Sequence, residues 1–166
     1  MDAVLRLAPI ALSLAGFSGL VAALRSRAIK DWLPRERLLL SLLLAGTLGV
    51  MFFSLLPSVF DSFGASTWIT WSVSSMTLGL YLMTVVILGL RSERALVRRG
   101  HKRAQPFAWW LFPATLIVSV GLLVNASGIV FAPSIGPYYT ALLFILMEAA
   151  GMFLLLLSFP TEGTGA

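Results

Sequence analysis

Glu148 is the residue whose position in the sequence most strongly suggests chemistry. It lies in the stretch ILMEAAGMF, residues 145–153, and is the sole charged residue of the apolar run 138–159. A charge at the centre of a bilayer costs about 3 kcal/mol on insertion scales, so an intramembrane carboxylate needs a partner or a bound proton. Glu148 is therefore either a structural hydrogen-bonding group or a site that handles protons or cations.

Asn125 is the predicted partner of Glu148. Only six residues join the apolar runs 108–131 and 138–159, so we expect an antiparallel hairpin. Counting inward from this connection places Gly121 level with Glu148 and Asn125 about one turn nearer the connection. Side chains lean toward the N-terminal end of their own helix, so Asn125 and Glu148 lean toward each other across Gly121. A protonated carboxyl group hydrogen-bonded to the amide would be stable there.

The remaining residues do not form a recognisable catalytic set. The sequence has no GxxxxGK[ST], HExxH or GxSxG motif. Its one histidine, His101, lies beside Lys102 in a basic segment, where a solvated side chain is expected rather than a general base. Cysteine is absent, which excludes disulfides and thiolate metal ligands. We expect neither an enzyme nor a bound cofactor or metal.

The composition indicates an integral membrane protein. Of the 166 residues, 58% are hydrophobic and 11% are charged, whereas soluble domains are about a quarter charged. The net charge of +5 could suggest a nucleic-acid partner, but the cations fall in two short blocks between apolar runs. That pattern is typical of membrane topology. The expected partner is the lipid bilayer and not nucleic acid.

Five apolar runs are long enough to cross about 30 Å of hydrocarbon. We expect one all-α transmembrane domain over residues 1–166, with helices at about 3–24, 38–60, 67–90, 108–131 and 138–159. Of the twelve Lys and Arg residues, the segment 25–37 holds five and the segment 91–107 holds six. Because positive charge marks the cytoplasmic side, the N-terminus is predicted outside and the C-terminus in the cytoplasm.

Small residues at helical spacing predict where the helices pack. Helices in lipid associate where small side chains let the backbones approach. Small residues occur at every fourth position in the second run, at Ser41, Ala45 and Gly49, and in the third run, at Ser75 and Gly79. The predicted helix-packing residues of the other runs are Ala11, Ala15, Gly19, Ala23, Gly121, Gly128 and Gly151.

The second basic block has two interpretations. Its cations could contact anionic lipid headgroups, each contributing about 1 kcal/mol near the surface. Alternatively, they only set the orientation of the chain. The candidate lipid-contact residues are Arg94, Arg98, Arg99, Lys102 and Arg103.

Short motifs in the first 60 residues resemble those of a known family. They are GFSGLVAALRSR at 16–27, Trp32, ERLLLSLL at 36–43 and FFSLLP at 52–57. They are similar to a family of small, uncharacterised bacterial multi-pass inner-membrane proteins. The resemblance implies a bacterial inner-membrane location and transfers no activity.

Together these features predict a non-catalytic membrane protein that packs as a subunit of a homo-oligomer or a larger membrane complex. The alternative is a small homo-oligomeric channel or proton-coupled transporter with Glu148 as its titrating group. Nothing in the sequence identifies a transported species or a bound ligand.

Overall fold

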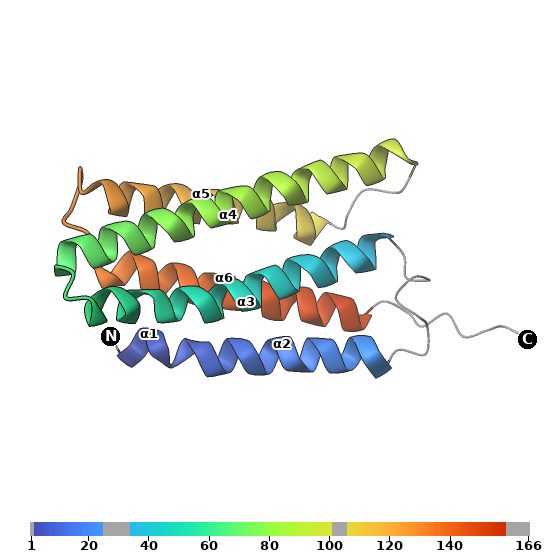
Figure 1. The fold of residues 1–166 in the computed structure, drawn as a ribbon. Helices are drawn as coiled ribbons and strands as arrows, with labels where there is room; N and C mark the ends of the chain where they lie inside the picture. Colours follow the sequence, from blue (N-terminus) through green and yellow to red (C-terminus); the bar gives the residue numbers. More distant parts are fainter. Residues whose placement is uncertain (1, 25–33, 101–105, 159–166) are drawn as a thin grey trace, which may run out of the picture.

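The computed structural model describes residues 2–24, 34–100 and 106–158. Helices account for nearly all of these residues, and no strand occurs among them. In chain order the helices are α1 (Asp2–Leu5), α2 (Leu7–Leu24), α3 (Pro34–Ser62), α4 (Thr67–Arg98), α5 (Pro106–Ser127) and α6 (Ile135–Ser158) (Figure 1). Within the described chain, five helical stretches are long and apolar enough to cross a membrane, as predicted.

At the charged end of the bundle, two helices extend beyond their predicted ends. Helix α3 begins at Pro34 rather than at residue 38, and α4 continues to Arg98 rather than ending at residue 90. The added segment of α4, RSERALVR, is rich in good helix formers. The helix stops where Gly100 adopts a φ of +84°, a conformation that glycine reaches without a Cβ clash. Charged residues that the sequence assigned to loops therefore lie on helices.

Helix α3 lies at the centre of the arrangement. It contacts α2, α4 and α6, while α5 packs mainly along α4 and touches α6 over a narrower surface. Figure 1 shows α4 and α5 at one side, α3 and α6 between, and α2 at the opposite side. The short connections after α3 and α5 lie at the same end of the bundle as the N-terminus.

Glycines permit the closest approaches between helices. A Cβ on Gly79 would lie 3.1 Å from Leu123 and 3.2 Å from the carbonyl oxygen of Ser119, so α4 meets α5 nearly backbone to backbone. A Cβ on Gly49 would lie 2.8 Å from the ring of Tyr81, whose hydroxyl donates to the carbonyl oxygen of Ala45 at 2.7 Å. The space that Gly49 leaves on α3 is thus filled by the aromatic ring of Tyr81 from α4.

Pro57 and Tyr138 connect α3 to α6. A proline inside a helix has no N–H to donate to the carbonyl four residues earlier, which in α3 is that of Phe53. The hydroxyl of Tyr138 donates to the carbonyl oxygen of Phe53 at 2.6 Å, and Tyr138 is fully buried. A side chain from α6 therefore supplies the hydrogen bond that Pro57 removes from α3.

Candidate functional site

Glu148 lies on α6 and is only 9% exposed. Thr115 Oγ1 on α5 lies 2.7 Å from Glu148 Oε1 and also 2.7 Å from the carbonyl oxygen of Leu111. A hydroxyl carries one hydrogen, and a carbonyl can only accept. Both contacts are satisfied when Thr115 donates to Leu111 and a protonated Glu148 donates to Thr115. The geometry therefore suits a neutral carboxyl group that holds α6 against α5.

Asn125 makes different contacts, nearer the end of α5. Its Nδ2 donates to Ser75 Oγ on α4 at 2.8 Å and to the carbonyl oxygen of Ser134 at 3.3 Å. Its Oδ1 accepts the N–H of Ser134 at 3.3 Å. The amide thus ties α5 to α4 and closes the connection that leads into α6, where Ser134 directly precedes the first helical residue.

The predicted hydrogen bond between Asn125 and Glu148 is therefore wrong. The sequence analysis extended the helix to residue 131, but α5 ends at Ser127, and Gly128 follows with a φ of +65°. Helix α6 also begins early, at Ile135. Counting inward from the observed ends brings Glu148 level with residue 114, beside Thr115, and leaves Asn125 close to the connection.

Further polar contacts continue between α4 and α5. Ser119 Oγ donates to the carbonyl oxygen of Gly79 at 2.7 Å. Ser72 Oγ donates at 2.5 Å to the carbonyl oxygen of Ala126, which lies in the last turn of α5, where intrahelical donors run out. The hydroxyl of Ser74, which is fully buried on α4, has no hydrogen-bond partner among the described residues. We call the buried residues Ser75, Thr115, Ser119, Asn125 and Glu148 the polar seam.

The sequence reasoning missed Thr115, although a signal for it exists. Positions 115, 119, 122 and 126 follow the spacing of one helix face, and all four residues are buried. Interpreting this helix as small-residue packing around Gly121 and Gly128 concealed the hydroxyl of Thr115. Three polar groups on the covered side of α5 define the seam.

Two further buried carboxylates lie at the charged end of the bundle. Glu36 on α3 is 8% exposed and Glu93 on α4 is 3% exposed, whereas the sequence analysis placed both in loops. Each has an interaction partner. They lie outside the apolar runs on which that analysis concentrated.

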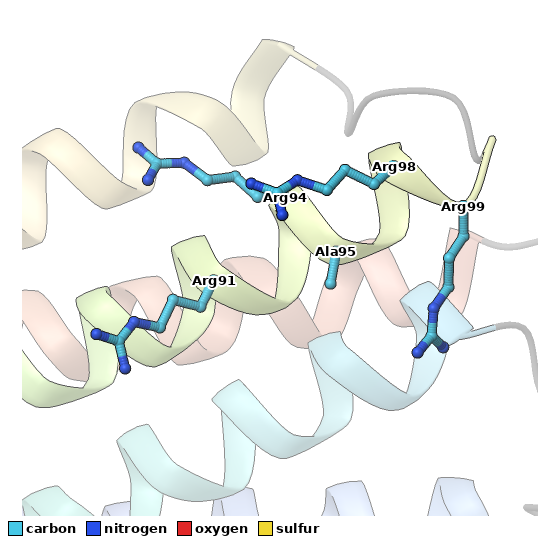
Figure 2. A pocket seen from close by; sticks show the side chains of 5 residues that line it. All are labelled: Arg91, Arg94, Ala95, Arg98 and Arg99. Carbon is cyan, nitrogen blue, oxygen red and sulfur yellow. The ribbon is translucent and has the colours of Figure 1, made fainter.

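Arginines from the same turns of α4 surround a pocket. Arg91, Arg94, Arg98 and Arg99, with Ala95, line a volume of about 420 Å³ (Figure 2). Three candidate lipid-contact residues, Arg94, Arg98 and Arg99, therefore lie at this pocket. The other two, Lys102 and Arg103, lie outside the described residues.

The predicted helix-packing residues have different surroundings. Ala11 is fully buried in the main core, and Ala15 and Gly151 are half-buried. Gly19 and Gly121 face outward, and a Cβ on either would meet nothing within 4 Å in the described part of the chain, so neither packs against another of its helices. Gly128 follows the end of α5, and a Cβ there would lie 3.7 Å from Trp68 on α4. The side chain of Ala23 lies outside the described part.

Across the described residues, no three side chains among His, Cys, Asp and Glu gather as a metal site would require. Comparisons of the chain with protein-family models, curated proteins and solved structures found no match. The resemblance of the first 60 residues to small bacterial inner-membrane proteins therefore stays a prediction.

A double-mutant cycle measures which contact Glu148 makes. We expect Thr115→Val and Glu148→Leu to be coupled by about 0.6 kcal/mol, the average for interhelical hydrogen bonds in membranes. Asn125→Leu and Glu148→Leu should be additive, since no contact joins them. The measurement is the free energy of unfolding in mixed micelles titrated with SDS. A stronger coupling for the Asn125 cycle would contradict the observed register.

Proposed function

We propose that this chain is an integral membrane protein of five crossings in a bacterial inner membrane, with its N-terminus outside and its C-terminus in the cytoplasm. The five apolar helices support this proposal. Both connections at the N-terminal end of the bundle, residues 63–66 and 128–134, lack Lys and Arg. Arg91, Arg94, Arg98 and Arg99 lie at the other end, on the last turns of α4.

Reporter fusions test this threading. An alkaline phosphatase fused to the N-terminus should be active, because it folds outside the cytoplasm. A fluorescent protein fused to the C-terminus should fluoresce, because it folds inside. An N-terminus found in the cytoplasm would overturn the orientation.

We propose further that the protein acts as a non-catalytic packing subunit of a homo-oligomer or a larger membrane complex. The observation that supports this role is the outward position of Gly16, Gly19 and Gly121, on α2 and α5. Lipid tails gain nothing from a glycine, whereas a second helix can approach its backbone closely. The two helices lie on opposite sides of the bundle, so each can meet a different neighbour (Figure 1).

Native mass spectrometry in mild detergent tests the assembly. We expect an oligomer for the wild type and a shift toward monomer for Gly121→Leu, because leucine would hold the helices apart. A clash of about 2 kcal/mol corresponds to a roughly thirtyfold higher dissociation constant. Thr84→Leu is the matched control, since Thr84 is exposed on α4 and its hydroxyl bonds only to its own helix. A wild type that is strictly monomeric, with nothing co-purifying, would contradict the subunit role.

The second candidate function is proton or cation transport through Glu148. The observation that favours it is the polar seam, in which Thr115, Ser119 and Asn125 extend over about 15 Å along α5. That length is about half of the hydrocarbon thickness. The hydrogen bonds of these three residues are separate from one another, so a proton path to Glu148 requires water that enters along them and links them.

A flux assay in liposomes separates the two functions. If Glu148 carries protons, Glu148→Gln should abolish flux, because the amide keeps the shape and cannot ionise. Glu93→Gln is the control, since it makes the same chemical change at the end of α4, outside the seam. A wild type that conducts nothing would exclude transport and leave Glu148 as a structural contact.

A further inference from the structure

The arginine pocket at the end of α4 is a feature that neither assembly nor transport uses. Its lining consists of four guanidinium side chains and one methyl group, that of Ala95. Figure 2 shows Arg91, Arg94 and Arg98 extending in one direction along the helix, while Arg99 points to another side. The pocket has a volume of about 420 Å³, and all five residues that line it are exposed, so it opens onto the surface of the protein.

Helical geometry separates the charges of this segment by sign. The sequence RSERALVRR contains both signs, yet Glu93 and Leu96 are buried, whereas Arg91, Arg94 and Arg98 are exposed. Spacings of three and four residues place these arginines on one outward face. The exposed charged residues of this segment are therefore all cationic, although its sequence contains both signs of charge.

These cations also lack an anionic partner within the described chain. The carboxylate nearest in sequence, Glu93, faces the interior and is 3% exposed. Like charges at this spacing repel one another unless an anion lies between them. A bound anion would relieve that repulsion, and planar guanidinium groups match phosphate oxygens in two-pronged hydrogen bonds.

The depth of the pocket relative to the proposed membrane indicates which kind of anion it binds. The apolar part of α4 ends at Leu90, and Arg91 to Arg98 cover the next 10 Å or so of the helix axis. The headgroup layer is about 5–8 Å thick on each side of the hydrocarbon. We propose that this pocket binds the phosphate of an anionic phospholipid in the cytoplasmic leaflet. The proposal rests on the proposed membrane insertion and is independent of assembly.

Ala95 gives the site its shape. In Figure 2 its methyl group lies between Arg91 and Arg99, with Arg94 and Arg98 on the other side of the helix, and the surface is hollow where a larger side chain would fill it. A headgroup can enter there and meet guanidinium groups on more than one side. A zwitterionic lipid such as phosphatidylcholine carries the same phosphate but would bring its choline against the same cations and be disfavoured.

Native mass spectrometry of the full chain in neutral detergent tests the site, with short-chain phosphatidylglycerol, phosphatidylcholine of equal chain length, and glycerol 3-phosphate as probes. We expect phosphatidylglycerol adducts in clear excess over phosphatidylcholine and no stable glycerol 3-phosphate adduct. Removing two cations with Arg94→Gln and Arg98→Gln should weaken phosphatidylglycerol binding roughly thirtyfold. Ala95→Leu should also weaken it, because it fills the pocket without changing the charge.

Arg25→Gln with Arg27→Gln is the matched control, because it removes the same charge from the first basic segment. Equal losses of phosphatidylglycerol binding in the control and in the Arg94 and Arg98 variant would show that general surface charge, and not this pocket, holds the lipid. Equal binding of both lipids, or glycerol 3-phosphate binding as tightly as the lipid, would also overturn it. The same spectra report the oligomeric state, so loss of lipid binding and loss of assembly are read separately.

Discussion

The packing of this chain depends on one constraint: a polar group carried into an apolar bundle costs free energy unless it finds its hydrogen-bond partner there. Among the described residues, the hydroxyls of Ser58 and Ser74 are the exceptions. In the proposed membrane, lipid offers no alternative partner, so an unsatisfied group costs several kcal/mol, or about as much as a lost hydrogen bond in a dry environment. Hydrogen bonds between helices satisfy buried polar groups in two ways. Hydroxyls reach backbone carbonyls, as Ser119 reaches Gly79 and Tyr81 reaches Ala45. Side chains also pair with side chains, as Thr115 pairs with Glu148.

The same constraint explains which helices become partners. Helices α5 and α6 are consecutive in the chain, yet α5 packs mostly on α4. Its covered face carries Ser119 and Asn125, and both bond to α4. Gly79 then allows the two backbones to approach closely enough for a short hydroxyl to reach a carbonyl oxygen. The short connection between α5 and α6 predicts that they pack as a hairpin. The hydrogen bonds of Ser119 and Asn125 instead hold α5 mainly against α4.

The helices themselves could be predicted because each apolar run is long enough to cross a membrane as a helix. Their ends were harder, since RSERALVR is polar enough to suggest a loop and yet helical by propensity and burial. The partner of Glu148 was harder still. It depended on α5 ending four residues before its predicted end and on α6 beginning three residues before its predicted start. Together these shift the register by about two helical turns, which exchanges Gly121 for Thr115 as the neighbour of Glu148.

Pro57 and Tyr138 have a consequence for how this bundle can move. The bond between the Tyr138 hydroxyl and the Phe53 carbonyl joins α6 to α3 at one fixed height. If α6 slid along α3 by a single turn, the tyrosine would lose its acceptor, and a carbonyl that its own helix cannot satisfy would stand bare in an apolar interior. Sliding of α6 along α3 therefore costs about 1–3 kcal/mol for the unsatisfied carbonyl, whereas tilting about Tyr138 keeps its hydrogen bond.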